Sequence, residues 1–177
     1  MRTHSPAAQV ICDPILGDAP KGLYLPPETA ARMKSHLVPL ADVLTPNAFE
    51  LSWLTGRPAG DVAEAVRAAR SLACRTVVVT SVPVAPDRLA TLLVESGEAV
   101  ATTVAARVGV PHGTGDLLTG LLAAYLALGA PPKVALAQSG AVLEAAVAAS
   151  LGRDDLKVID VLRRLDEFAP LPVGPVA

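Results

Sequence analysis

The sequence predicts a layered α/β fold in which a largely parallel sheet is covered by helices on both faces. Short apolar strands alternate with helix-length segments along the chain, and polar residues follow directly after several of these strands. A strongly apolar helix also begins at a polar turn that contains two glycines, Gly113 and Gly115. In such sheets ligands bind at the carboxyl ends of the strands, so these polar residues indicate a binding site.

The first half of the chain is expected to contain three strands and three helices. The strand at 9–12 is apolar and ends at Asp13, and a loop rich in glycine and proline follows it to Pro27. A helix at 28–37 is expected to turn Ala31, Met33 and Leu37 inward. A strand at 42–45, ended by Pro46, and a helix at 47–54, ended by Gly56, follow it. A helix at 61–73, capped by Asp61, then leads to a β-branched strand at 76–80 that is buried on both faces.

The second half is expected to be a hairpin followed by helices. Strands at 89–95 and 99–105 flank the turn residues Ser96, Gly97 and Glu98. A buried, apolar helix starts at Gly115, an Ala- and Val-rich helix occupies 133–149, and a more amphipathic helix occupies 155–168. With no internal repeat and no long linker, we expect one domain over 1–177, with a loose tail at 170–177.

Composition and charge disfavour several classes of partner. The formal net charge is −2, and Lys and Arg do not cluster, so nucleic acid and anionic membranes are poor candidates. Cys12 and Cys74 lie in apolar stretches without metal-ligand spacing, as expected of reduced cysteines in a cytoplasmic protein. The apolar run 117–128 is too short to cross a bilayer.

The turn before the apolar helix has the chemistry of an anion site. The first turn of a helix presents unpaired N–H groups and the positive end of its dipole, and glycines let an anion approach them closely. A carboxylate at Asp116 would repel phosphate, but it fits a site where a hydroxyl loses its proton before attacking a phosphoryl group. The alternative is that Asp116 only caps the helix and the glycines only form the turn.

This turn is the last of six motifs. They are D-P-I-L-G-D at 13–18, K-G-L-Y at 21–24, V-P-L-A-D-V-L-T-P-N-A-F-E at 38–50, L-T-G at 54–56, V-V-V-T-S at 77–81 and G-T-G-D at 113–116. On these motifs nearly the whole chain resembles the C-terminal part of a pyridoxal kinase in the ribokinase-like superfamily. Related hydroxymethylpyrimidine kinases usually carry a cysteine where Asp116 stands, which favours the pyridoxal branch.

The resemblance implies phosphorylation of the 5′-hydroxymethyl group of pyridoxal, or of related B6 vitamers, by ATP with Mg²⁺; a monovalent cation is a possible further cofactor. It implies that Asp116 is the catalytic base and that Gly113, Thr114 and Gly115 form the anion hole. In the N-x-x-E pattern of Asn47 and Glu50, the carboxylate would organise Mg²⁺, often through water.

The remaining site residues also follow from the resemblance. Asp13, Asp18 and Thr45 correspond to residues near the ATP phosphates and the metal, and Thr80 and Ser81 to nucleotide contacts. Each also has a simpler interpretation: Asn47 as a helix cap, Asp18 as a loop carboxylate, Thr80 as a strand residue. Less specific expectations concern His112 beside the turn, Arg88 near a nucleotide, Trp53 in the core, and His4 and His36 on the surface.

The chains of this family are longer at the N-terminus, which implies that the upstream half of the sheet and most of the vitamer pocket are missing here. An exposed strand edge would then favour pairing with another chain, and we expect a homodimer. Two other functions stay open: a catalytically impaired nucleotide-binding fragment and a hydroxymethylpyrimidine kinase.

Overall fold

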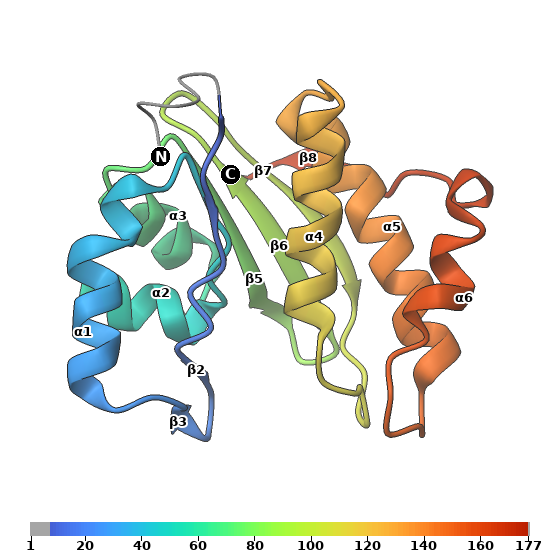
Figure 1. Ribbon diagram of the computed structural model, residues 1–177, viewed down its shortest axis with the longest axis horizontal. Helices are drawn as coiled ribbons and strands as arrows, with labels where there is room; N and C mark the ends of the chain where they lie inside the picture. The colour runs from blue at the N-terminus through green and yellow to red at the C-terminus, as the bar shows by residue number, and fades with distance from the viewer. Residues whose placement is uncertain (1–7, 177) are drawn as a thin grey trace.

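The computed structural model describes residues 8–176, and these residues form a three-layer α/β fold (Figure 1). The central sheet has six strands in the order β1-β4-β5-β6-β7-β8. They are β1 (Ile11–Cys12), β4 (Val43–Leu44), β5 (Thr76–Ala85), β6 (Arg88–Val94), β7 (Ala99–Ala105) and β8 (Gly174–Pro175). The expected α/β class is confirmed.

The sheet is divided into a parallel and an antiparallel part. β1 pairs in parallel with β4, and β4 with β5. Strands β5 to β8 pair in antiparallel fashion, because β5 continues beyond residue 80 and turns directly into β6. The parallel part, where the carboxyl ends of neighbouring strands meet at one edge, therefore covers only the first three strands of the order.

Alternate residues of β5 pack against the two helical layers. Val77 and Val79 face a core built with α2 (Ala48–Thr55) and α3 (Val62–Arg70), and α1 (Pro27–His36) extends this layer. Val78 faces the opposite core, with α4 (Thr114–Ala127) and α5 (Pro132–Ser150). Figure 1 shows α1 to α3 on one side of the sheet, and α4, α5 and α6 (Val158–Leu162) on the other. The expectation that strand 76–80 is buried on both faces is confirmed over 76–79.

Helix boundaries in the first layer follow from local capping. Asn47 and Asp61 cap α2 and α3, each accepting a hydrogen bond from the backbone N–H three residues later. Gly56 ends α2 in the left-handed conformation, with φ of 68°. The expected starts of both helices are confirmed.

The tail and the last helix differ from expectation. Leu171 N–H donates to the carbonyl of Ala137, and β8 pairs with β7, so residues 171–176 are not a loose tail; Ala177 lies outside the described residues. The helix expected at 155–168 is broken into α6 and a 3₁₀ turn, Leu165–Glu167, because Arg164 leaves helical geometry with φ of −129°. Val161, Leu165 and Phe168 still pack against α5.

Two local details were missed and two burial expectations were wrong. A small hairpin of β2 (Gly17–Asp18) and β3 (Gly22–Leu23) lies within the loop expected before Pro27, and a 3₁₀ turn occupies Val38–Leu40. In α1, Met33 packs against the core as expected, but the buried alanine is Ala30 rather than Ala31. Leu37 is 47% exposed, since it follows the last residue of the helix. The apolar α4 is buried on one side only, and Leu128 at its end is 83% exposed.

Within residues 8–176, no helix has both the length and the apolarity that crossing a membrane requires. His4 lies outside the described residues, and His36 is exposed, as expected. Trp53 is half-buried in the core beside α1, where the Lys34 ammonium lies 5.8 Å from its ring centre.

We predict that Leu92→Ala on β6 will lower the free energy of unfolding by about 2–5 kcal/mol, because Leu92 is fully buried and its removal leaves a cavity. The matched control is Leu128→Ala, which should change it by less than about 0.5 kcal/mol, since that side chain is largely in solvent. Urea denaturation measures both. Equal losses would contradict this assignment of the core.

Candidate active site

One cavity of about 620 Å³ lies where the parallel strands end, and its lining contains every site residue expected from the sequence. These residues are Asp13, Asp18, Thr45, Asn47, Glu50, Thr80, Ser81, Gly113, Thr114, Gly115 and Asp116. They come from four separate segments, 13–18, 45–50, 80–81 and 113–116, so only folding brings them together. Asp116 therefore opens into the same cavity as Asn47 and Glu50.

Parallel pairing places the strand-end residues side by side. Asp13 follows β1, and Thr45 follows β4 with its N–H donating to the carbonyl of Cys12, 3.1 Å away. One strand further, Asn47 forms a parallel bridge with Thr80, whose N–H donates to the carbonyl of Pro46 at 2.9 Å. The edge of the sheet thus sets the spacing of these side chains.

Asn47 and Glu50 form a buried polar clamp. Oε2 of Glu50 accepts from the N–H of Asn47 at 2.8 Å, and the Asn47 Oδ1 accepts from the N–H of Glu50 at 2.9 Å. Oε1 of Glu50 accepts from the N–H of Leu16 at 2.7 Å, and from that of Gly17 at 3.4 Å. The Asn47 amide also donates to the Gly17 carbonyl at 2.8 Å. The N-x-x-E pattern therefore caps α2 and fixes the loop that follows Asp13.

The start of α4 is open, in contrast to the capped starts of α2 and α3. Its N-cap is Gly113, and within the described chain no side chain caps this helix. The first backbone bond runs from Leu117 N–H to the Gly113 carbonyl, which leaves the preceding N–H groups facing the cavity. Gly113 has a φ of 97°, a conformation that residues with a Cβ rarely adopt. This is the geometry of an anion site.

Asp116 lies on the first turn of α4 with its side chain exposed to the cavity. Among residues 8–176 its carboxylate makes no hydrogen bond or ion pair, so its oxygens remain available to accept a proton. Asp116 therefore does not act as a simple helix cap.

Burial raises the pKa of Asp13, and the charge of Asp116 raises it further. The hydroxyl of Thr119 lowers this pKa by donating a hydrogen bond to the carboxylate. Burial likewise raises the pKa of Glu50, against the hydrogen bonds from Asn47, Leu16 and Gly17. The negative charge of Asp116 therefore disfavours ionisation of Asp13 in the shared cavity. A bound cation would relieve this repulsion.

Two non-glycine residues of the lining have left-handed backbone conformations. They are Ile15, with φ of 46°, and Ser81, with φ of 58°. Ser81 sits where the register of β5 and β6 shifts. Such conformations cost about 1–3 kcal/mol each and are concentrated at functional sites.

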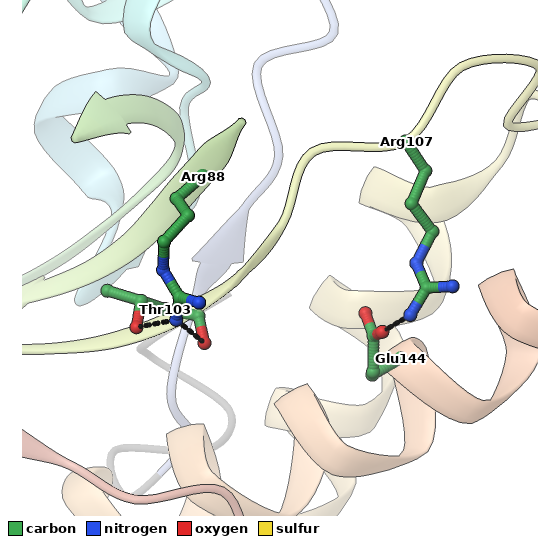
Figure 2. A network of polar contacts seen from close by, with 4 residues as sticks. All are labelled: Arg88, Thr103, Arg107 and Glu144. Atoms are coloured by element: carbon green, nitrogen blue, oxygen red, sulfur yellow. Dashed lines mark hydrogen bonds and ion pairs between the residues drawn. The ribbon is translucent and has the colours of Figure 1, made fainter. Parts of the chain in front are cut away.

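Sequence reasoning missed the far wall of the cavity. Arg107, in the segment after β7, forms an ion pair with Glu144 of α5, and this pair joins two sides of the cavity (Figure 2). Apolar side chains of α5 line the wall beside it: Leu136, Leu143 and Val147. Their helical spacing was visible in the sequence, but nothing distinguished a cavity wall from the core.

Two less specific expectations have different outcomes. His112 lines the cavity, where its side chain is exposed. Arg88 does not line it: its guanidinium donates to the Thr103 hydroxyl at 2.8 Å on the neighbouring strand (Figure 2).

Cys12 and Cys74 are free and half-buried, and burial raises the pKa of both thiols.

The donor set at the strand ends suits a hard cation. It consists of oxygen ligands, with Asp13 as the carboxylate nearest the parallel strands and Thr45 beside it. Mg²⁺ typically binds one or two carboxylates and keeps waters and substrate phosphates as its other ligands. Among residues 8–176, no group of three or more His, Cys, Asp or Glu could hold a metal ion by itself.

Comparison with known proteins identifies relatives along most of the chain. The family model described as phosphomethylpyrimidine kinase matches residues 1–158. A pyridoxine/pyridoxal/pyridoxamine kinase of Bordetella bronchiseptica is 37% identical over 168 residues, which cover 92% of this chain and 54% of that protein. The chain thus spans about half the length of this curated relative.

Solved structures agree with the fold. A pyridoxal kinase from Entamoeba histolytica superposes with a TM-score of 0.88 at 25% identity, over 99% of this chain and 65% of that one. A pyridoxal kinase from Leishmania donovani, in complex with ADP and pyridoxamine, superposes with a TM-score of 0.85 at 28% identity, over 99% and 65%.

We predict different effects of adding a methyl group at two glycines of the turn. Gly113→Ala should lower the free energy of unfolding by about 1–2 kcal/mol, because it forces a Cβ into a left-handed conformation. Gly115→Ala should not lower it, since the new Cβ would lie 3.9 Å from Asp13 Oδ2, an ordinary contact. It should nevertheless weaken binding of inorganic pyrophosphate about tenfold, or about 1.4 kcal/mol, by filling the approach to the N–H groups. Denaturation and calorimetry measure these effects, and unchanged binding in Gly115→Ala would count against the anion site.

We predict that Asp13→Asn will stabilise the protein at pH 7. The pKa of Asp13 is raised in the folded state, so folding favours the protonated form, and stability from this group is lost as pH rises through the folded pKa. Asparagine is neutral and can still accept the hydrogen bond from Thr119. The advantage of the variant in melting temperature should be greatest at pH 7 and should shrink toward the ordinary aspartate value of 3.8. The prediction is refuted if the difference in melting temperature between variant and parent is smaller at pH 7 than at pH 4.

Proposed function

The chain belongs to the phosphomethylpyrimidine kinase family, and from this premise we propose that it transfers the γ-phosphoryl group of ATP to the 5′-hydroxymethyl group of pyridoxal or a related B6 vitamer. The relatives named as pyridoxal kinases, and the complex of one of them with ADP and pyridoxamine, support this assignment. The motif resemblance to pyridoxal kinases is likewise supported by the family match.

The observation that carries the proposal is the position of Asp116. Its carboxylate has no hydrogen-bond or ion-pair partner among residues 8–176, and it lies on the first turn of α4, which no side chain of these residues caps. The same cavity holds Asp13 and the strand-end residues. A helix start binds phosphate well and a carboxylate binds it poorly, so their combination suits a reaction that needs both an anion hole and a base.

In the proposed step Asp116 accepts the proton of the substrate hydroxyl. The alcohol oxygen forms a bond to the γ-phosphorus, the bond between that phosphorus and the bridging oxygen of ADP breaks, and ADP leaves with the electron pair. The N–H groups at the start of α4 stabilise the charge on the transferred phosphoryl oxygens. One well-placed donor of this kind contributes on the order of 10²- to 10³-fold in rate.

Mg²⁺, when bound, would neutralise the charge of the ATP phosphates, and we assign Asp13 to hold it with Thr45 and Asp18 nearby. We place Glu50 in the outer shell, acting through water, because both of its oxygens already accept backbone hydrogen bonds. A direct metal bond would compete with the contacts that fix the loop after Asp13.

We place the nucleotide between the strand ends and the apolar wall. Thr80 and Ser81 would contact it beside the phosphates, while Leu136, Leu143 and Val147 of α5 offer an apolar surface to the base. Hydrophobic lining with a few polar groups is typical of such pockets. The homodimer, the cytoplasmic location and a monovalent-ion site stay predictions, and sedimentation tests the first of them.

We predict that Asp116→Asn will lower kcat for pyridoxal phosphate formation by about 10²- to 10⁴-fold, because the amide cannot accept the proton. Binding of Mg·ADP should persist, since the N–H groups and Asp13 are unchanged. The control is Asp160→Asn, an equally conservative change on the exposed face of α6, which should keep full activity. A coupled assay with Mg·ATP and pyridoxal measures turnover, and calorimetry measures binding.

The same assay separates the alternatives. If the parent chain and Asp116→Asn are equally inactive while Mg·ATP still raises the melting temperature, the chain is a nucleotide-binding module. If hydroxymethylpyrimidine is phosphorylated and pyridoxal is not, the substrate assignment is wrong but the reaction class stands. Full activity of Asp116→Asn would remove the base from the mechanism.

A further inference from the structure

A hydroxyl that belongs to none of the six sequence motifs contacts two residues of the cavity lining, although it does not line the cavity itself. Thr119 is on α4, three residues after Asp116 and thus on the same side of the helix. Its Oγ1 lies 3.0 Å from Asp13 Oδ2 and 2.9 Å from the Oγ1 of Thr45. Thr119 therefore connects the helix that carries Asp116 with the ends of β1 and β4.

The carboxylate fixes the direction of this hydrogen-bond chain. An ionised carboxylate only accepts, so Thr119 donates its single proton to Asp13. Thr119 then accepts from Thr45, which is 4% exposed and has one proton to give. The other contact of that hydroxyl, with the Cys12 carbonyl, is 3.5 Å long and therefore weak. The order is Thr45 to Thr119 to Asp13.

We propose that Thr119 is a positioning residue for phosphoryl transfer: its hydroxyl holds Asp13 in the orientation that the Mg²⁺·nucleotide complex requires. This inference rests on the proposed function. Asp13 and Asp116 share the cavity and repel one another, and the donated hydrogen bond holds Asp13 in place against that repulsion. Hydrogen-bonding partners of metal ligands commonly change metal affinity or activity by about 10- to 100-fold when they are removed.

Thr119→Val tests the hydroxyl with little change in shape. The variant keeps the branched side chain but cannot donate to Asp13, while Thr45 can still turn its proton to the Cys12 carbonyl, so the fold has a way to adapt. Thr119→Ser restores the donor without the methyl group. Thr55→Val is the matched control, because Thr55 bonds the Leu51 carbonyl within α2 and does not line the cavity.

The first measurement is turnover of pyridoxal as a function of Mg²⁺ at saturating ATP. We expect Thr119→Val to raise the Mg²⁺ concentration for half-maximal rate about tenfold, with the KM for pyridoxal unchanged. Thr119→Ser should stay within about twofold of the parent, and so should Thr55→Val. The second measurement is calorimetric binding of ADP with and without Mg²⁺, in which only Thr119→Val should lose most of the gain in affinity that Mg²⁺ gives.

The inference is overturned if Thr119→Val keeps the Mg²⁺ dependence of the parent, or if Thr119→Ser is as impaired as Thr119→Val, which would assign the effect to packing of the methyl group. If the parent chain makes no product, the kinase proposal fails, yet the comparison of ADP binding among the variants still decides the role of Thr119. Absence of any Mg²⁺ effect on ADP binding to the parent would overturn both.

Discussion

The site depends on one buried carboxylate that acts on the backbone. Glu50 is 4% exposed, and burial of a charge is costly unless hydrogen bonds compensate it. Its two oxygens accept the N–H groups of Asn47, Leu16 and Gly17, which ties the start of α2 to the loop after β1. Asp13 lies at the beginning of that loop, between the end of β1 and the residues that Glu50 fixes. The carboxylate that we propose as a metal ligand thus precedes a loop segment that a second carboxylate holds in place.

The two kinds of strand pairing have different roles around this clamp. Parallel pairing of β1, β4 and β5 brings polar residues that are far apart in the chain to one edge. The antiparallel strands β6 and β7 supply a surface on which α5 packs, and α5 in turn provides the apolar wall of the cavity. The division of the sheet therefore separates the region that we propose for phosphate and metal from a region with an apolar wall.

The electrostatics of the cavity favour ligand binding over stability. Burial and the charge of Asp116 raise the pKa of Asp13, and no side chain of the described residues caps the N–H groups in the first turn of α4. A bound cation would compensate the charge of the carboxylates, and a bound phosphate would accept hydrogen bonds from the N–H groups. The left-handed backbone conformations of Ile15 and Ser81 likewise cost stability at residues that line the cavity.

The sequence alone determined the α/β class and the starts of α2 and α3, because caps and β-branched strands act through near neighbours in the chain. The resemblance of its motifs to a known family added a set of residues that the structure brings to one cavity. The sequence did not determine the antiparallel pairing of β5 with β6, the β8 strand, the one-sided burial of α4, or the contacts of Thr119, Arg107 and Glu144. Each of these depends on which segments meet in space, and no local pattern specifies the partner. Thr119 shows this most clearly: in the chain it is one polar residue in an apolar helix, and only the fold places Asp13, which is 106 positions away, within 3.0 Å of its hydroxyl.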